Sequence, residues 1–417
     1  MIRISDVLDA DPFSDLPLSA DEVHLLVNRE EIKERIDALV HSASKGFPQN
    51  VALLGEDGTG KTSLLNFAEA KAKLLSGFFV SHIDVVEGTQ IRDIVKILIR
   101  DLLNQIHFGL GSSLLRLVSL GREVTHDELQ KRLTGVNVTK SKQLKLGESL
   151  VNVFQYSRSI TESKTSPEDI VGLLDMLRSA FALIGKAPKA IMLLFDEGQY
   201  VATSKAVSLL QQMRLLFQSR PYVLVVGGSP DLFQRFSEVE PTFGNLFSEQ
   251  NRFRLEPLAH AHVSELLEKR LALVRKKGGG IEPFEPDCVE RLRDLSDGNP
   301  RYVIRIASAA LGLARGESSV APQHVEEAGM QIIREMGRDR LDRLNADERE
   351  LILTVARYQP INFSALQKTL PTSIDLSTVS RKVRSLEDRG YIELEVRGIE
   401  KLCRLRRALY EHVKTLI

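Results

Sequence analysis

The sequence predicts an α/β protein: a parallel sheet forms its core, a helical segment follows, and a smaller part made of helices and a short antiparallel element ends the chain. Three observations predict this class. The apolar stretch 51–54 runs directly into a glycine-rich loop and then a helical pattern. Two further apolar stretches, 190–195 and 222–226, end in polar residues and are typical of strands buried on both faces. From about residue 259 onward, apolar residues recur at helical spacing.

Composition places the chain among globular proteins. Its 417 residues allow roughly two to four domains. With 43% hydrophobic and 27% charged residues and no long apolar run, we expect a cytoplasmic protein without a membrane span or membrane partner. The N-terminus carries no apolar segment typical of a secretory signal, and Cys288 and Cys403 lie too far apart in sequence to indicate a disulfide framework or zinc site.

The loop after the first strand has the pattern G-x-x-x-x-G-K-T. Glycines let successive backbone N–H groups face a phosphate, and the following helix adds its positive N-terminal end. We expect Lys61 to reach the β- and γ-phosphates and act in catalysis, and the Thr62 hydroxyl to bind Mg²⁺. The predicted nucleotide-binding residues are Gly55, Glu56, Asp57, Gly58, Thr59, Gly60, Lys61, Thr62 and Ser63.

Two later strands end in polar residues that belong at the same edge of the sheet. The strand 190–195 leads into Asp196 and Glu197, which we expect to hold Mg²⁺ and to act as general base towards the attacking water. The strand 222–226 leads towards Ser229, which either senses the γ-phosphate as a catalytic residue or is a plain turn serine. The expected cofactors are therefore ATP and Mg²⁺.

These residues carry a family resemblance: the chain resembles AAA+ ATPases of the initiator branch, namely origin-recognition initiators, archaeal relatives and transposon regulators. Residues 26–31 are similar to the "G-R-E" box of that branch, with Asn28 in place of the usual Gly. Residues 196–199 resemble its "D-E-x-Q" form, and 11–13 its short lead-in motif. The segment 298–301 opens a helix, and the resemblance implies that Arg301 binds nucleotide and links its state to a helical lid.

The resemblance also implies a catalytic arginine donated by a neighbouring subunit, just before the last strand of the core. We place that strand at 253–258 and choose Arg252, with Arg254 and Arg235 as rivals. Such an arrangement implies self-association in a nucleotide-dependent ring or filament.

The chain divides into four predicted parts. The number of residues between Lys61 and Asp196 is larger than in a minimal core of this type and predicts an insertion. Residues 144–153 of this insertion suggest a β-hairpin. Lys140, Lys142 and Lys145 make DNA contact conceivable, and a hairpin used for packing or partner contact is an equal alternative. The predicted parts are a lead-in at 1–20, an ATPase core at 21–257 with an insertion at about 107–166, a helical lid at 258–338 and a C-terminal domain at 339–417.

The C-terminal domain resembles a winged helix-turn-helix. Helices are expected at 346–357, 363–370 and 376–389, followed by strands at 390–395 and 401–405 around Gly398. Arg381, Lys382 and Arg384 on the third helix are the candidates for contact with duplex DNA. Lys and Arg number 14 against 11 Asp and Glu over 341–417, so a domain that binds protein, or that locks the ATPase closed, stays open as an alternative.

The sequence thus predicts an ATP-dependent switch that binds and hydrolyses ATP, self-associates, engages duplex DNA and recruits or loads an unidentified protein partner. The rival hypothesis is a signalling ATPase of the STAND or defence type, whose winged helix is a regulatory module. A second rival, a scaffold that binds ATP without hydrolysis, is disfavoured by the presence of Glu197.

Overall fold

The computed structural model describes residues 3–86, 89, 94, 97, 101, 189–201, 207–218, 220–370, 374–398 and 400–417. The predicted insertion at 107–166, its expected hairpin at 144–153 and the three lysines within it lie outside these residues.

A five-stranded, fully parallel sheet forms the core, in the order β2-β3-β4-β1-β5. The two strands that lead to the predicted site, β1 and β3, are separated only by β4. The strands are β1 (Val51–Leu54), β2 (Phe78–Asp84), β3 (Ala190–Asp196), β4 (Tyr222–Gly228) and β5 (Arg252–Arg254).

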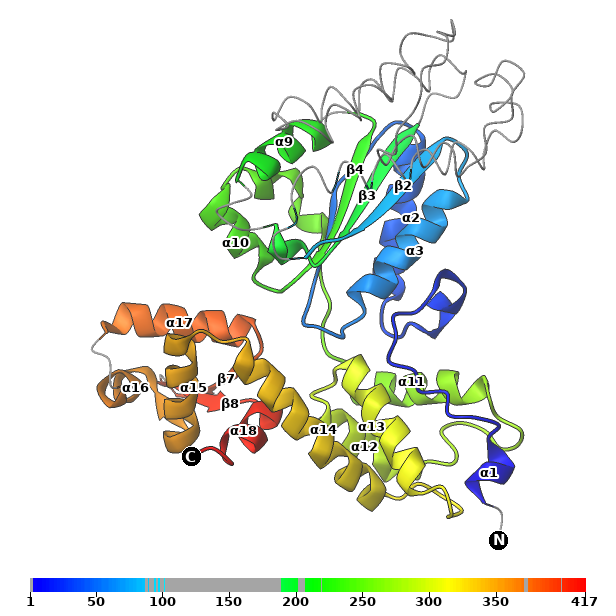
Figure 1. Ribbon diagram of the computed structural model, residues 1–417, viewed down its shortest axis with the longest axis vertical. Coiled ribbons are helices and arrows are strands. Elements are labelled where there is room, and N and C mark those ends of the chain that lie inside the picture. Colours follow the sequence, from blue (N-terminus) through cyan, green and yellow to red (C-terminus); the bar gives the residue numbers. More distant parts are fainter. Residues whose placement is uncertain are drawn as a thin grey trace, which may run out of the picture.

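Helices cover both faces of this sheet, so the central strands β1, β3 and β4 are buried along their whole length (Figure 1). Alternate residues of β1 face opposite layers: Leu53 packs with the α2–α3 layer, and Leu54 packs with the α9–α10 layer. One layer contains α2 (Glu30–Ser44) and α3 (Lys61–Lys73), and the other contains α9 (Val207–Phe217), α10 (Leu232–Val239) and the 3₁₀ turns η4 (Phe243–Leu246) and η5 (Glu249–Asn251).

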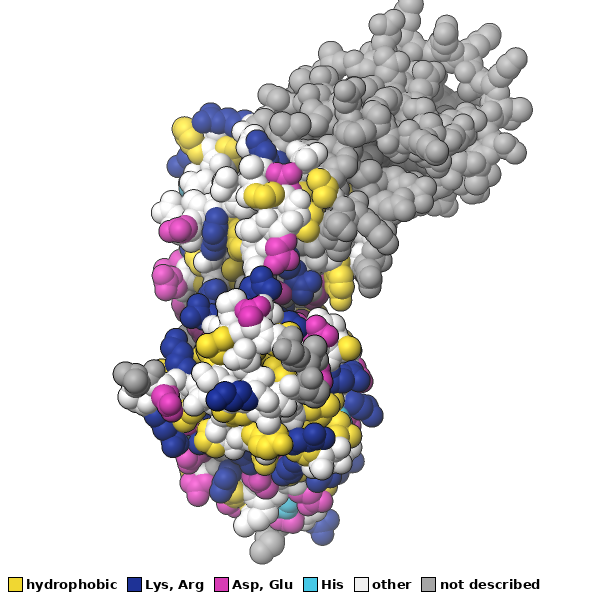
Figure 2. Space-filling view, turned by 90° about the vertical axis from the view of Figure 1, so that its left-hand side faces the viewer, with side chains coloured by type: hydrophobic (Ala, Val, Ile, Leu, Met, Phe, Trp, Pro, Cys, Tyr) yellow, Lys and Arg dark blue, Asp and Glu magenta, His cyan; other side chains and the backbone are white. Residues whose placement is uncertain are grey.

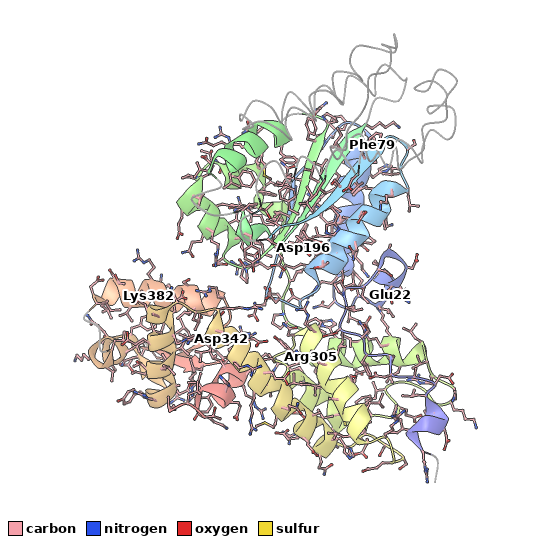
Figure 3. All side chains as sticks on the ribbon, viewed as in Figure 1. Glu22, Phe79, Asp196, Arg305, Asp342 and Lys382 are labelled. Atoms are coloured by element: carbon pink, nitrogen blue, oxygen red, sulfur yellow. The ribbon has the colours of Figure 1, made fainter. Side chains whose placement is uncertain are left out.

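The carboxyl ends of the strands face the rest of the molecule. Figure 3 places Phe79, near the start of β2, at the far end of the sheet, and Asp196, the last residue of β3, at the end nearest the helical region. The loops that follow β1, β3 and β4 therefore meet at this edge, where ligands of open parallel sheets bind.

The helical region below the sheet has its own apolar core, to which the N-terminal segment contributes Ile4, Leu8 and Phe13. Phe13 packs edge-on against Phe284, with ring centroids 5.8 Å apart. The elements are α1 (Ile4–Val7), α11 (His260–Ala272), α12 (Asp287–Leu295), α13 (Pro300–Leu313) and α14 (Pro322–Asp342). A 3₁₀ turn, η1 (Ala20–Leu25), then leads to the core.

The C-terminal part is a helix-turn-helix with a small antiparallel sheet in the order β6-β8-β7. Gly398, with φ of +63°, turns the chain between β7 and β8, as the sequence predicts. The elements are α15 (Ala346–Tyr358), β6 (Ile361–Asn362), α16 (Phe363–Thr369), α17 (Leu376–Asp388), β7 (Ile392–Arg397), β8 (Glu400–Leu405) and α18 (Arg407–Val413).

One continuous helix, α14, connects the lid to the C-terminal part. Met336 belongs to the apolar cluster of the lid, whereas Leu341 belongs to that of the C-terminal part. Helix α18 packs back on α14, where a Cβ at Gly337 would lie 2.7 Å from the carbonyl oxygen of Ala408. The close crossing of these helices therefore requires glycine at this position.

The predicted fold class is confirmed, and the structure corrects three details. The last core strand is β5 (Arg252–Arg254) rather than 253–258, because the chain turns into the lid at Pro257. The C-terminal sheet has a third strand, β6, and a final helix, α18, which the sequence analysis did not anticipate. Cys288 and Cys403 are buried free thiols, as expected. Among the described helices, none is long and apolar enough to span a bilayer.

Candidate functional site

The glycine-rich loop follows β1 and wraps around the side chain of Lys61. Gly58 and Gly60 have φ of +84° and +97°, which permits the loop to turn without Cβ clashes. The Lys61 ammonium donates hydrogen bonds of 3.0 Å to the carbonyl oxygens of Gly55 and Glu56. Helix α3 begins at Lys61, so its free N–H groups point into the space beside the ammonium.

Two oxygen ligands meet where α3 approaches β3. The Thr62 hydroxyl donates to Oδ2 of Asp196 at 2.5 Å, and the Asp196 carboxylate is buried. Hydroxyl and carboxylate oxygens are the ligands that Mg²⁺ prefers in proteins. The pair therefore fits the predicted magnesium ion, which would be bound by the oxygens of Thr62 and Asp196.

Glu197 follows in a strained backbone conformation, with φ of +56°. Its side chain lines the same cavity as Lys61 and Thr62. Gln199 donates a hydrogen bond from Nε2 to the Glu197 carboxylate and accepts one from the Ser229 N–H at 3.1 Å. The Ser229 hydroxyl itself donates to Asp231 at 2.5 Å, and Ser229 is not among the residues that line the cavity.

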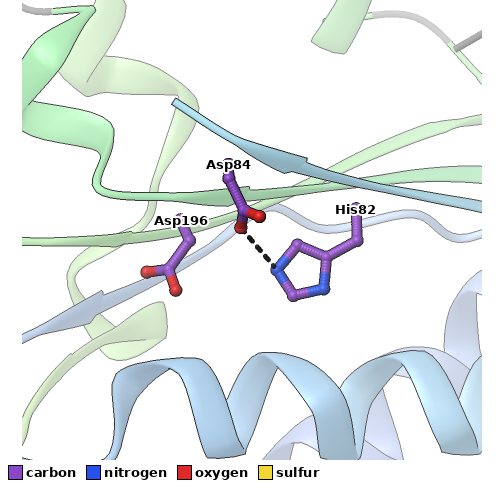
Figure 4. A group of neighbouring side chains, drawn as sticks. All are labelled: His82, Asp84 and Asp196. Atoms are coloured by element: carbon purple, nitrogen blue, oxygen red, sulfur yellow. Dashed lines mark ion pairs between the residues drawn. The ribbon is translucent and has the colours of Figure 1, made fainter. Parts of the chain in front are cut away.

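A cluster not anticipated from the sequence adjoins Asp196. Asp84 and Asp196 are register partners at the ends of β2 and β3, and with His82 their ligand atoms lie within 4.8 Å of one another (Figure 4). Burial alone would lower the pKa of His82, but the hydrogen bond with Glu69 and the nearby carboxylates raise it. These contacts favour the protonated imidazole, so a metal ion bound by His82 would have to displace that proton.

The lid closes on the phosphate loop through the start of α13. The Asn299 amide donates to the carbonyl oxygen of Asp57 at 2.8 Å, and the Arg301 N–H donates to that of Gly58 at 3.3 Å. Arg301 lines the cavity together with Lys61. The structure therefore brings together residues 57–63, Glu197 and Arg301 around one cavity, and Asp196 adjoins it through its hydrogen bond with Thr62.

Asn28 stands where the proteins that this chain resembles usually have glycine, and its backbone conformation shows how asparagine fits there. Its φ is +55°, in the left-handed region that asparagine tolerates better than most residues. This turn directs the buried Arg29 guanidinium to the carbonyl oxygens of Asn28 at 2.8 Å, Glu256 at 2.9 Å and Thr59 at 3.4 Å. Arg29 therefore fastens the phosphate loop to the connection between β5 and the lid.

The N-terminal segment forms one wall of the cavity. The buried Arg270 of α11 donates to the carbonyl oxygens of Pro12 and Ser14, and the Leu18 N–H donates to the Ser63 hydroxyl at 3.0 Å. The segment therefore bridges lid and core. The cavity is lined by residues 15–18, 25–27, 29, 57–63, 197, 258, 266, 270, 300, 301 and 304.

The two acidic side chains of the phosphate loop contact arginines of the C-terminal half, and the Asp57 carboxylate also lies 3.8 Å from the Lys61 ammonium. Arg340 donates to the Glu56 carboxylate at 2.6 Å, and Arg406 lies 3.8 Å from it. Arg343 pairs with Asp57. Burial alone would raise the pKa of Asp57, but the Lys61 and Arg343 cations outweigh it and lower that pKa. We call these two carboxylates and three arginines the loop latch.

The predicted trans-acting arginine is engaged within its own chain. Arg252 donates to the carbonyl oxygens of Gly244 and Phe247, and its guanidinium lies 4.1 Å from the centroid of the Phe233 ring. Of the two rivals, Arg235 pairs with Asp231 at 2.9 Å. Arg254 is exposed and forms no hydrogen bond or ion pair with any residue that the structure describes.

The three DNA candidates lie on α17, apart from the cavity; Figure 3 labels one of them, Lys382. Arg381 and Arg384 are exposed and lack ion-pair partners in the described part of the chain, whereas Lys382 pairs with Asp347 at 2.8 Å. Figure 2, viewed from the α16 side, shows Lys and Arg side chains scattered among hydrophobic ones rather than gathered in one patch.

Sequence reasoning missed the loop latch, the role of Gln199 between Glu197 and Ser229, and His82. The only sequence signal for the latch was the pair of acidic residues at variable positions of the phosphate loop. The three arginines lie 284 to 350 positions later and carry no pattern that would pair them with it.

Comparisons with known proteins agree with this geometry. Residues 25–226 match the model of the AAA ATPase domain. An uncharacterized HTH-type transcriptional regulator of Methanocaldococcus jannaschii is 22% identical over 395 residues, which cover 94% of this chain and 89% of that protein.

Solved structures share the fold at low sequence identity. The ORC2 protein of Aeropyrum pernix, in ADPNP and ADP complexes, is 15% identical and covers 98% of both chains with a TM-score of 0.61. A Walker-type ATPase of Pyrococcus abyssi is 15% identical and covers 96% of this chain and 99% of that chain, with a TM-score of 0.59. Residues 25–226 are thus similar to the AAA ATPase domain, and the resemblance inferred from the sequence is confirmed at the level of fold.

Gly58→Ala tests the contact between phosphate loop and lid. An added Cβ would lie 2.6 Å from Cβ of Arg301 and 2.8 Å from Oδ1 of Asn299, so α13 must withdraw. We expect ATP affinity, measured by calorimetry, to fall about tenfold or more, which corresponds to roughly 1.4 kcal/mol. Gly46→Ala is the matched control, because Gly46 has φ of +87° with nothing within 4 Å of an added Cβ. Equal affinities in the two variants would contradict a role for this contact.

Proposed function

We propose that this chain uses its AAA ATPase domain as an ATP-dependent switch, which binds and hydrolyses ATP, self-associates, engages duplex DNA and recruits or loads a protein partner. The observation that carries the proposal is the meeting of Thr62 and Asp196 at 2.5 Å beside Lys61, on a cavity closed by Arg301. The fold shared with a nucleotide-bound archaeal protein supports it.

The residues around the cavity have distinct roles in this proposal. Loop amides and Lys61 bind the phosphates, and Arg301 compensates charge on the γ-phosphate from the lid side. Mg²⁺ bound at Thr62 and Asp196 would neutralise charge on the β- and γ-phosphates. Glu197 accepts a proton from the water that attacks the γ-phosphorus. Ser229 would have to turn its hydroxyl away from Asp231 to respond to the γ-phosphate. The left-handed backbone at Glu197 supports a functional role, because such strain clusters at active sites.

Self-association would complete the site with an arginine from a second copy. The sequence favours Arg252 for this role, but its guanidinium would have to leave the Phe233 ring and two carbonyl oxygens to reach a neighbouring subunit. The exposed Arg254, two residues along β5, meets the requirement without such a loss. We therefore favour Arg254 for this role.

Duplex DNA is proposed as a ligand of α17. The helix-turn-helix arrangement of α16 and α17, the exposed Arg381 and Arg384, and the similarity to an HTH-type regulator support this. Lys382 would have to give up its ion pair with Asp347 to bind a DNA phosphate.

Steady-state ATP turnover tests the enzymatic part of the proposal. We expect Glu197→Gln to retain ATP binding and to lower kcat by about 10²- to 10⁴-fold, the usual contribution of a general base. Glu238→Gln is the matched control, because Glu238 is exposed on α10, where it accepts a hydrogen bond from Gln234 outside the cavity. Turnover that survives in Glu197→Gln would contradict the assignment of the base.

Duplex binding measured across a salt series tests the DNA part. We expect Arg381→Ala with Arg384→Ala to weaken binding and to reduce the slope of log K against log salt by about 0.9 for each lost phosphate contact. The control is Arg357→Ala, which removes an exposed arginine from α15. An unchanged slope would exclude α17 as the DNA-binding element.

A second candidate function is favoured by the loop latch. In a signalling ATPase, the winged helix would hold the nucleotide site in a resting state, and the contacts of Arg340 and Arg406 with Glu56 couple these two parts. The switch would then respond to a protein or small-molecule trigger rather than to DNA.

The variant Arg340→Ala distinguishes the signalling ATPase from the DNA-linked switch. The Arg340–Glu56 contact is largely buried, and a charge-assisted hydrogen bond contributes roughly 1.5–3 kcal/mol, so its loss would raise the open population about tenfold or more. We expect basal ATP turnover to rise in Arg340→Ala and to stay unchanged in Arg305→Ala, which removes a different α14 ion pair, with Glu335. Turnover that falls or stays constant in Arg340→Ala would exclude the latch as a brake.

A further inference from the structure

We propose that Gln199 is a positioning residue for ATP hydrolysis: it holds the carboxylate of Glu197 in place and couples it to the tip of β4 at Ser229. The inference rests on the proposed ATPase function and adds a residue that does not line the cavity. Gln199 lies on the 3₁₀ turn η2 (Gly198–Tyr200), directly after the acidic pair.

The orientation of the Gln199 amide is fixed by its partners. The Ser229 backbone N–H can only donate, so the group that faces it at 3.1 Å must be the amide oxygen Oε1. The amide nitrogen Nε2 then faces the Glu197 carboxylate, which can only accept when ionised. A flipped amide would set donor against donor on one side and acceptor against acceptor on the other. One side chain therefore connects two strand ends in a single orientation.

Glu197 needs such a support because no other residue that the structure describes bonds to its carboxylate. A glutamate side chain has three rotatable bonds, and a general base must point at the water that it deprotonates. Glu197 has a left-handed backbone conformation and lines the cavity. The hydrogen bond from Gln199 then restrains the far end of its side chain.

The turn that carries Gln199 is itself rigidly placed. Gly198 packs so closely against β4 that an added Cβ would overlap the Val226 side chain. The Ser229 hydroxyl continues the chain of contacts to Asp231 at 2.5 Å, and Asp231 accepts from Arg235 of α10 at 2.9 Å. A shift of the β4 tip or of α10 therefore moves the amide that holds Glu197, so the base is aligned only when this edge of the sheet is in place.

Two substitutions at one position separate positioning from simple structural support. Gln199→Leu removes both hydrogen bonds. Gln199→Glu has the same shape and keeps an acceptor for the Ser229 N–H, but it replaces the donor to Glu197 with a second carboxylate. Gln211→Leu is the matched control, because Gln211 also donates to a carboxylate, that of Glu240, at 3.1 Å but on α9.

The experiment measures kcat and KM for ATP together with thermal unfolding. We expect both Gln199 variants to lose about tenfold to 10²-fold in kcat with KM within about twofold of wild type, since misplacing a reacting group lowers the chemical step. Gln211→Leu should keep both constants.

Other outcomes overturn the inference. Wild-type kcat in Gln199→Glu would show that only the Ser229 contact matters. A lower melting temperature together with a raised KM in both variants would show a structural role. Turnover lost in Glu197→Gln but kept in Gln199→Leu would overturn this inference alone. Absence of turnover in the wild type would overturn the proposed function and this role with it.

Discussion

The phosphate loop and the start of α3 are where parts of the chain that lie far apart in sequence make contact. The loop and the start of α3 are bonded by the lead-in, the lid, α14 and the start of α18, while Lys61 lines the cavity. Their partners are Leu18 of the lead-in, Arg29 before α2, Asn299 and Arg301 of the lid, Arg340 and Arg343 of α14, and Arg406 at the start of α18. A ligand in this cavity therefore acts on all of these contacts at once.

The chemistry of these contacts explains how the parts can separate. The sheet core and the C-terminal part have distinct apolar clusters, without a shared member among the described residues. They meet through carboxylates and arginines, which exchange partners for water or phosphate at far lower cost than a buried apolar interface. A nucleotide adds several negative charges beside Glu56 and Asp57, so it competes for the same cations. The lid is tied more firmly, because the lead-in contributes to its core and also bonds to Ser63.

The sequence predicted the sheet and its motifs because their signals are local. Strands β1, β3 and β4 are continuous apolar runs, and the phosphate loop is contiguous with β1, so their residues needed no knowledge of the fold. The loop latch and the Gln199 bridge depend on side chains brought together by topology, and no spacing in the sequence marks them. Strand β6 has two residues, too few for periodicity to detect. The engagement of Arg252 with Phe233 likewise depends on how the loop between α10 and β5 folds back.

A distance measurement between the core and the C-terminal part tests the central claim, that nucleotide at the phosphate loop resets the position of the winged helix. Spin labels at Glu238→Cys on α10 and Arg381→Cys on α17 occupy exposed positions, and the two native cysteines are buried. In a Glu197→Gln background, which preserves bound ATP in this account, we predict that ATP with Mg²⁺ shifts the distance distribution to longer values than in the nucleotide-free protein. Identical distributions in the two states, with ATP binding verified, would contradict the account.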